Sequence, residues 1–90
     1  MATLIVRHEV DDFGTWKRAY DEFDAERRGM GVTGHAVYRS EGHPNDVTVL
    51  HDFDTLEDAR AFAMSPRLVE VMRAAGVRGE PEIWFGSRVE

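Results

Sequence analysis

The chain has 90 residues, of which 42% are hydrophobic and 31% charged, a composition that indicates one folded domain and not a disordered segment. It has no cysteine, which excludes disulfides and thiol chemistry, and its net charge of −6 argues against binding to a phosphate backbone. Because no apolar run approaches the ~20 residues of a membrane span and the first residues lack a signal peptide's apolar segment, we expect a cytoplasmic protein that binds neither membrane nor nucleic acid.

The first half of the chain predicts a strand, a helix and a second strand. β-Branched residues at Thr3–Val10 indicate the first strand. The next apolar and aromatic residues recur at helical spacing, so a helix is expected, with Asp11 or Asp12 as its cap and Gly29 and Gly31 as its stop signals. Residues 33–40 then return to a strand pattern.

A turn and three further elements complete the second half. The residues of Glu41–Asp46 are typical of a turn, and the pattern of Val47–Asp54 indicates the third strand. A helical segment follows from Thr55, which forms a capping box with Asp58. Proline lacks the N–H that a helix interior needs, so this helix should break at Ser65–Pro66, restart there and end at Gly76. Residues 82–89 supply the last strand.

The element order β-α-β-β-α-β predicts an α+β domain with the ferredoxin-like arrangement, in which two helices cover one face of a four-stranded antiparallel sheet. The whole chain, residues 1–90, forms this single domain. The other sheet face stays bare. Because so short a chain buries only about 60–65% of its unfolded surface, we expect the bare face to bind a second copy of the chain.

Strand alternation predicts which side chains lie on each face of the sheet. We expect the helix-covered face to carry Leu4, Val6, Val10, Ala36, Tyr38, Val47, Val49, His51, Phe53, Ile83 and Phe85. The bare face should carry Ile5, Arg7, Glu9, His35, Val37, Arg39, Thr48, Leu50, Asp52 and Trp84. The assignment in the second strand assumes a hairpin without a β-bulge, which would invert it. The bare face then resembles a cavity wall with a few placed polar groups.

His35 and Asp52 are the expected catalytic pair. A carboxylate beside an imidazole raises the pKa of the imidazole and fixes its tautomer, as a general base requires. The alternative is an ordinary cross-strand ion pair worth about 0.2–1 kcal/mol. His8, near a strand end, is a further candidate at the cavity rim. His51 is expected to pack under a helix and His43 to be solvated in the turn.

Four other residues are candidate ligand contacts. Trp84 and Leu50 could hold a planar ligand or could fill a dimer interface. Arg7 and Arg39 could orient a phenolate or carboxylate or could pair with carboxylates on the sheet. No metal site is expected, because the histidines do not share a face in this assignment, and no phosphate-binding loop is present. A bulge could bring histidines together, and a single axial histidine for haem stays open as an alternative.

At this point the chain resembles the dimeric α+β-barrel superfamily, in particular its small proteins named cyclase or antibiotic biosynthesis monooxygenase. The resemblance covers nearly the whole chain and is carried by "VRHEVDDFGTWKRAYDE", "GVTGHAVYRS", "VLHDFDTLEDARAFAMSP" and "EIWF". It implies that two sheets pair into a barrel and that a ligand lies within the barrel or between helices and sheet. Members include cofactor-independent monooxygenases of aromatic polyketides, polyketide cyclases, lactone isomerases and haem-handling proteins. No catalytic motif of any one family is present.

Two hypotheses follow. The first is a cofactor-independent monooxygenase or cyclase for a planar aromatic or polyketide-like molecule, in which His35, oriented by Asp52, removes a proton and the arginines stabilise the anion. The second is a non-catalytic homodimer that binds a small ligand. An open cavity with His35 at its wall would favour the first, and a dry, filled interior would favour the second.

Overall fold

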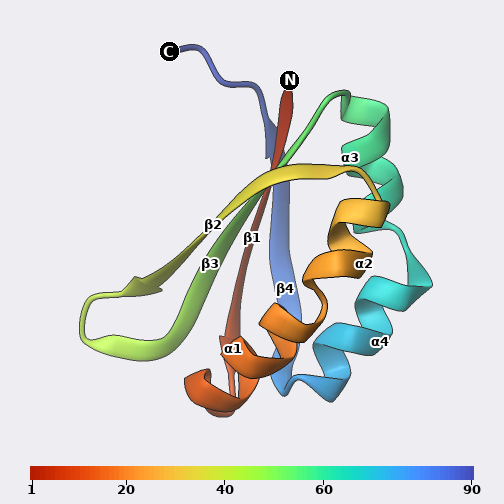
Figure 1. Cartoon of the computed structure of the whole chain (residues 1–90). Coiled ribbons are helices and arrows are strands. Elements are labelled where there is room, and N and C mark those ends of the chain that lie inside the picture. Colours follow the sequence, from red (N-terminus) through yellow and green to blue (C-terminus); the bar gives the residue numbers. More distant parts are fainter.

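The computed structural model describes residues 1–90 and has eight elements, shown in Figure 1. In chain order they are β1 (Ala2–Val10), α1 (Phe13–Glu22), α2 (Asp24–Gly29), β2 (Val32–Ser40), β3 (His43–Phe53), α3 (Leu56–Ala63), α4 (Pro66–Ala74) and β4 (Val77–Gly86). The strands form one antiparallel sheet in the order β2-β3-β1-β4, and all four helices lie on one face of it. The predicted ferredoxin-like α+β fold is therefore confirmed.

The helices begin where the sequence predicts. The Asp12 carboxylate accepts a hydrogen bond from the Thr15 amide at 2.9 Å, which caps α1. The Thr55 hydroxyl accepts one from the Asp58 amide at 3.1 Å, which caps α3. The predicted break is also confirmed, since α3 ends at Ala63 and α4 starts at Pro66. No helix is long and apolar enough to cross a membrane.

The first helical segment is divided, whereas the sequence pattern predicts one helix. The division falls at Phe23, which ends α1 and precedes α2. The Arg27 guanidinium reaches back over the junction and donates to the Tyr20 carbonyl. Phe23 is buried in the core, so the aromatic spacing continues across the junction and hides it in the sequence.

The hairpin differs most from the prediction. A register shift lies between Val32, which pairs with Phe53, and Gly34, which pairs with Asp52. One extra residue in β2 turns every later side chain of that strand to the opposite face. His35, Val37 and Arg39 therefore lie on the helix side and Ala36 and Tyr38 on the bare side, so the predicted faces of this strand are wrong.

The hairpin turn is also shorter than predicted, because β3 already starts at His43. A second register shift lies between Arg39 and Ser40. Pro44 falls in this shift and has no partner in the ladder, so the sheet does not need the N–H that proline lacks. Likewise β4 starts at Val77 and not at Glu82. Gly79 and Pro81 suggest a loop, but a shift in the β1–β4 ladder lets the strand continue through them.

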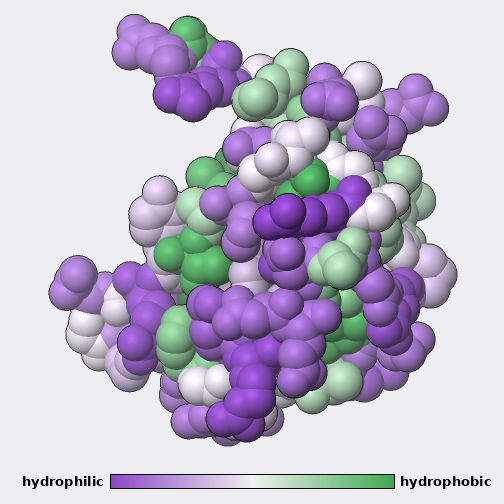
Figure 2. Space-filling view, in the orientation of Figure 1, coloured by the Kyte–Doolittle hydropathy of each residue, from purple (hydrophilic) through white to green (hydrophobic).

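The core lies between the helices and the sheet in two clusters. One contains Ala2, Leu4, Val6, Phe23, Val32, Phe53, Ala59, Phe62 and Leu68, and the other Val10, Trp16, Tyr20, Val47, Val49 and Ala75. The edge strand β4 is less covered, since Ile83 and Phe85 face the helix side and are still 39% and 38% exposed. Figure 2 shows a largely hydrophilic outer surface with smaller apolar patches between the polar regions.

Candidate functional site

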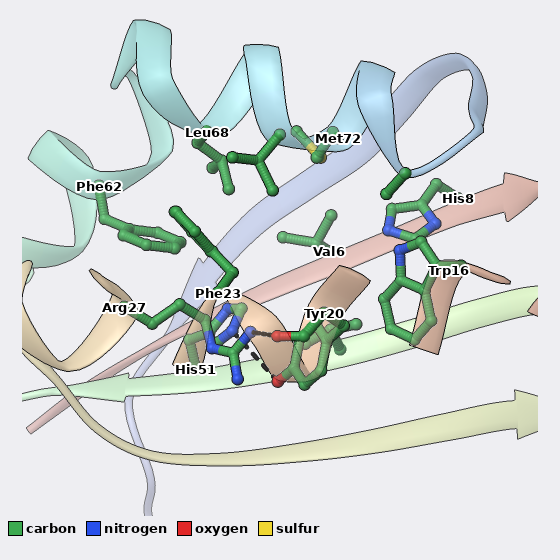
Figure 3. A pocket seen from close by; sticks show the side chains of 13 residues that line it. Val6, His8, Trp16, Tyr20, Phe23, Arg27, His51, Phe62, Leu68 and Met72 are labelled. Atoms are coloured by element: carbon green, nitrogen blue, oxygen red, sulfur yellow. Dashed lines mark hydrogen bonds between the residues drawn. The ribbon is translucent and has the colours of Figure 1, made fainter. Parts of the chain in front are cut away.

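A small cavity lies between the two core clusters, under α1, α2 and α4 (Figure 3). Its volume is about 50 Å³, and ten of the thirteen residues that line it are hydrophobic. The lining residues are Val6, His8, Trp16, Tyr20, Phe23, Arg27, Val49, His51, Phe62, Leu68, Val71, Met72 and Ala75. The cavity thus combines an apolar wall with a few polar groups, the usual make-up of a small-molecule site.

Three buried side-chain nitrogens have no hydrogen-bond partner in the chain, and all three belong to residues that line this cavity. They are His8 Nδ1, Arg27 Nε and His51 Nδ1. No other buried side-chain nitrogen or oxygen atom is left unpartnered. Burying a polar group without a hydrogen bond costs about 1–3 kcal/mol. Three such groups around one cavity therefore indicate that water or a ligand provides the missing hydrogen bonds.

Arg27 supplies the only permanent charge in the cavity. It comes from α2, is 2% exposed, and its guanidinium lies 3.7 Å from the centre of the Tyr20 ring. One terminal nitrogen donates to the Tyr20 carbonyl and the other contacts the Asp24 carboxylate at 3.2 Å. These contacts fix the guanidinium against the ring and leave its Nε–H as a donor for an acceptor in the cavity.

The Tyr20 hydroxyl connects two histidines from neighbouring strands. It lies 2.7 Å from His35 Nδ1 and 3.4 Å from His51 Nε2. His35 and His51 are paired across the β2–β3 ladder, which brings both rings to the same side of the sheet. The sequence-based face assignment placed these two histidines on opposite faces.

Burial favours the neutral forms of the two histidines and the tyrosine of the cavity. Desolvation, with smaller contributions from the Arg27 charge and from His35, lowers the pKa of His51 from 6.5 to about 3. Desolvation also lowers the pKa of His8 and raises the pKa of Tyr20 to about 12. At neutral pH His51 therefore offers an uncharged imidazole with a free Nδ1, which can accept a hydrogen bond or a proton.

His8 occupies the other end of the cavity, beside Trp16, with ring centres 5.6 Å apart (Figure 3). It also borders a charged hollow at the surface, formed with Arg7, Glu9, Asp46, Arg78, Gly79, Glu80 and Glu82. His8 lies where the cavity and this surface hollow meet, and its predicted catalytic role stays a prediction. His8 thus separates the apolar interior from a polar entrance.

The expected pair of His35 and Asp52 does not form. Asp52 pairs with Gly34 in the ladder, lies on the bare face, and accepts a hydrogen bond from the Thr3 hydroxyl at 2.8 Å. The bulge before Gly34 is the physical reason, because it turns His35 to the helix side. A side chain at position 34 would place its Cβ 3.2 Å from the Asp52 carboxylate, which is why glycine suits this position.

The two arginines singled out in the sequence lie outside the cavity. Arg7 on the bare face makes a two-bonded ion pair with Asp46, at 3.0 and 2.7 Å. Arg39 donates to the Pro44 carbonyl at 3.1 Å and stacks on the Phe13 ring. Arg7 thus follows the alternative of pairing with a carboxylate on the sheet, whereas Arg39 contacts a backbone carbonyl and an aromatic ring, which neither prediction described.

Trp84 and Leu50 lie on the bare face as expected. Each pairs with Ile5 of the central strand β1, from its two sides, and Trp84 is 46% exposed. They are remote from the helix-side cavity in this chain. No group of three or more histidine or acidic side chains is placed to bind a metal ion.

Sequence reasoning missed Trp16, Tyr20 and Arg27 as site residues. The two aromatic residues follow the helical spacing of a core stripe, which is where they are, so the spacing gives no sign of the cavity. Arg27 lies near the predicted end of the helix, where a cation suits the helix dipole, so its position alone indicates no site. The overlooked signal is that Arg27 lies seven residues after Tyr20, two helical turns along one face.

Comparison with solved structures identifies the fold. A protein from Bordetella bronchiseptica, provisionally named an antibiotic biosynthesis monooxygenase, superposes with a TM-score of 0.82 at 18% identity, covering 99% of this chain and 97% of that one. SnoaB, a cofactor-independent oxygenase from Streptomyces nogalater, superposes at 0.79 with 14% identity, covering 99% and 93%. The chain has the fold of the antibiotic biosynthesis monooxygenases. A second protein provisionally named an antibiotic biosynthesis monooxygenase, from Nitrosomonas europaea, superposes with a TM-score of 0.74 at 17% identity over the full length of both chains.

The likeness to the antibiotic biosynthesis monooxygenases is one of structure alone. No protein-family model matches the sequence, and no curated protein sequence matches it. At identities of 14–18% the comparison establishes the arrangement of strands and helices and assigns no role to any side chain. The chemistry of the site has to be argued from the cavity itself.

Proposed function

We propose that this protein is a cofactor-independent oxygenase or cyclase that acts on a planar phenolic or polyketide-like molecule in the helix–sheet cavity. The observation that carries the proposal is the set of three unpartnered buried nitrogens around one apolar cavity. The fold of SnoaB supports the same class of activity, at the level of likeness only. A flat apolar ligand with an acidic oxygen or methylene group matches such a lining.

In this proposal His51 is the general base, and the anion that develops on the bound substrate beside it raises its pKa from the low value that burial gives the empty site. Its free Nδ1 takes a proton from an acidic C–H or O–H of the substrate, and the Arg27 Nε–H stabilises the oxygen anion that forms. In the oxygenase version the substrate carbanion gives electrons to O₂ and forms a hydroperoxide after reprotonation. Loss of water then leaves a ketone, so a methylene and O₂ yield a carbonyl and one water. In the cyclase version the same carbanion attacks a carbonyl of its own chain.

A planar substrate requires the cavity to widen. Pockets for drug-sized ligands measure about 300–1,000 Å³, far more than the 50 Å³ of the closed cavity. The wall that can yield is α4, which contributes Leu68, Val71 and Met72 but has Leu68 as its only fully buried residue. The break before Pro66 can act as a hinge, so α4 can move without α3.

We also propose that two copies pair through the bare sheet face. That face carries Ile5, Ala36, Tyr38, Leu50 and Trp84, and Tyr38 and Trp84 are 58% and 46% exposed. Exposed aromatic side chains on an otherwise uncovered sheet face are typical of an interface. A second copy supplies a matching apolar surface that covers the exposed Tyr38 of β2 and Trp84 of β4.

An anthrone is a suitable probe, because it is a planar tricyclic ketone with an acidic methylene. We expect the protein to convert it to the quinone with consumption of one O₂ per product, measured with an oxygen electrode and by absorbance. His51→Gln should lower the rate about 10²-fold or more. His43→Gln, in the exposed hairpin, is the matched control and should keep the full rate. A His51→Gln variant as active as the wild type would contradict the proposed base.

The second candidate function is a non-catalytic homodimer that binds a small ligand. The small volume of the closed cavity favours it. The chain has two tryptophans, and only Trp16 lines the cavity, so a Trp84→Phe variant reports on the cavity alone. Quenching of Trp16 fluorescence by the anthrone without oxygen uptake would favour the binding protein, and quenching with oxygen uptake the enzyme.

A further inference from the structure

The Tyr20 hydroxyl lies between the interior of the protein and its surface. On one side is His51, which is 5% exposed and lines the cavity. On the other side is His35, an exposed residue of the edge strand β2 that lines a separate surface hollow with Asp24, Arg28, Val32, Thr33 and Gly34. A continuous chain of hydrogen-bonding groups therefore runs from the cavity to solvent.

The hydroxyl carries one proton, so it can donate to only one of the two imidazoles. We assign the donated bond of Tyr20 to the shorter contact, 2.7 Å to His35 Nδ1. It then accepts from the His51 Nε2–H at 3.4 Å, which leaves Nδ1 of His51 unprotonated. That nitrogen is one of the three without a partner in the chain. The tautomers are thus aligned in one direction, from the cavity outward.

We propose that Tyr20 and His35 form a proton relay that connects His51 in the cavity with solvent at the β2 hollow. The part of this inference that concerns a substrate proton rests on the proposed function. The connection itself is a property of the three side chains and holds whatever the cavity binds. Tyr20 and His35 touch no substrate, so they are positioning and relay residues, and His51 is the group that faces the reaction.

Each step of the relay conserves protons. His51 Nδ1 takes a proton from the substrate, and the His51 Nε2 proton passes to the Tyr20 oxygen. The original Tyr20 proton passes to His35 Nδ1, and the His35 Nε2 proton leaves to water. The result is one proton moved outward and three groups that are again neutral, with both imidazoles in their other tautomer. Passage of one proton inward, to a peroxide or alkoxide formed in the cavity, restores the starting arrangement.

A purely structural role for these contacts predicts something different. The buried Tyr20 hydroxyl needs one partner, and His51 alone could provide it. His35 is exposed and can be hydrated, so its 2.7 Å bond is not needed to satisfy its own ring. The bulge before Gly34 turns His35 to the helix side, where it can reach Tyr20. A structural bond would leave exchange of the buried His51 proton dependent on opening of the protein.

The test is the exchange of the His51 Nε2 proton with water, measured by NMR on the intact protein labelled with ¹⁵N-histidine. We expect a neutral His51 protonated at Nε2, whose proton exchanges fast through the relay. His35→Gln keeps an acceptor for Tyr20 but cannot pass a proton, and it should slow the exchange at least tenfold. His43→Gln, which alters another exposed histidine of the same hairpin, should leave the rate unchanged.

Two further measurements guard against a fault in folding. Tyr20→Phe should slow the exchange as His35→Gln does, and if it does not fold, the His35 variants decide alone. In His35→Ala, imidazole added to the buffer should restore fast exchange in proportion to its concentration. Equal exchange rates in wild type and His35→Gln, or a His51 protonated at Nδ1, would overturn the relay. In this test a water molecule in the cavity replaces the substrate as the proton donor to His51 Nδ1. Because no substrate enters it, the relay and the proposed oxygenase or cyclase activity can fail independently.

Discussion

The two faces of the sheet treat their polar groups in opposite ways. On the bare face Arg7 is paired with Asp46, and Asp52 with Thr3, at ordinary hydrogen-bond distances. On the helix-covered face, where burial makes an unpaired polar group costly, His8, Arg27 and His51 each leave a nitrogen without a partner. Paired polar groups in contact with water need no further explanation. Unpaired ones in a covered cavity point to function.

The same comparison separates two kinds of apolar side chain. Phe62 and Phe53 are buried among the helices, while Trp84 and Tyr38 project from the bare face. The first kind maintains the fold of one chain, and the second is available to a partner. Substitutions on the two faces should therefore change different measured quantities, and the predictions below use this difference, from the largest expected effect to the smallest.

Phe62→Ala should have the largest effect on stability. Phe62 is 1% exposed and packs against His51 and Phe53, with ring centres 5.2 and 5.4 Å apart. Loss of its ring should lower the free energy of unfolding by about 3–5 kcal/mol, a large share of the ~5–15 kcal/mol of a typical domain. Urea denaturation measures this. A loss below about 1 kcal/mol would show that the covered face is not tightly packed.

The effect of replacing Arg27 on the free energy of unfolding should depend on how well the new side chain fills the same space. Arg27→Ala leaves a void beside the cavity and should cost about 2–4 kcal/mol. Arg27→Met fills the space without a buried charge and should be close to neutral, because Asp24 keeps its contact with Arg28 and the Tyr20 carbonyl still accepts from the Phe23 amide. Methionine should nevertheless weaken binding of an anionic probe. Equal destabilisation by both replacements would show that the charge itself maintains the fold.

The contrast between the two hairpin strands shows which parts of the fold can be predicted from the sequence. In β3 the alternation of Val47, Val49, His51 and Phe53 is strict, and its faces are predicted correctly. In β2 one bulge inverts every later residue, and nothing in the alternation reveals it. Gly34 within the strand is the available signal, because a glycine there often marks a bulge or a close approach.

The candidate site could be predicted only in part, for a related reason. His8 and His51 lie on β1 and β3, whose registers follow from the apolar pattern, so their side of the sheet is predictable. Tyr20 and Arg27 belong to two helices joined at Phe23, and the position of their side chains over the sheet depends on packing angles. A one-dimensional pattern carries no information on those angles.

Acid should destabilise the covered face through His51. Its folded pKa of about 3 lies below the unfolded value of 6.5, so the unfolded chain binds more protons as the pH falls. The contribution of His51 to stability is therefore present above about pH 6.5 and is lost as the pH falls from 6.5 to about 3. From pH 7 to 5 this loss should be about 2 kcal/mol, at pH values above the ~4 at which carboxylates are half protonated.

His8 adds to the loss in the same direction, because its pKa is also lowered by burial. In His51→Leu the decline of unfolding free energy between pH 7 and 5 should be smaller by about 2 kcal/mol, measured by urea denaturation at each pH. His43→Leu, an exposed histidine, is the control and should decline as the wild type does. An unchanged slope in His51→Leu would mean that His51 is protonated normally in the folded state.

Trp84→Ala should leave the fold of one chain intact and weaken its dimer. Trp84 is 46% exposed, so little packing within the chain is lost. At the centre of an interface, truncation of a tryptophan typically costs about 2 kcal/mol or more, which is at least a tenfold weaker association. Light scattering should show a dimer for the wild type and a 10.2 kDa monomer for the variant at low micromolar concentration. A wild type that is monomeric there would remove the proposed pairing.

Glu26→Gln should have the smallest effect on stability and a local effect on motion. Arg67 at the start of α4 binds Glu26 of α2 through two hydrogen bonds, at 2.9 and 2.8 Å, which fasten α4 over the cavity. Exposed ion pairs add little to global stability, so the unfolding midpoint should hardly change. Amide hydrogen exchange should become several times faster in α4 and stay unchanged in α3, on the other side of the break before Pro66.

The control is Arg67→Lys, which loses the two-bonded geometry but keeps the charge. Its exchange rate in α4 should lie between those of the wild type and Glu26→Gln. Uniform acceleration in both helices would mean that they open as one unit, and entry to the cavity would then need a route other than movement of α4.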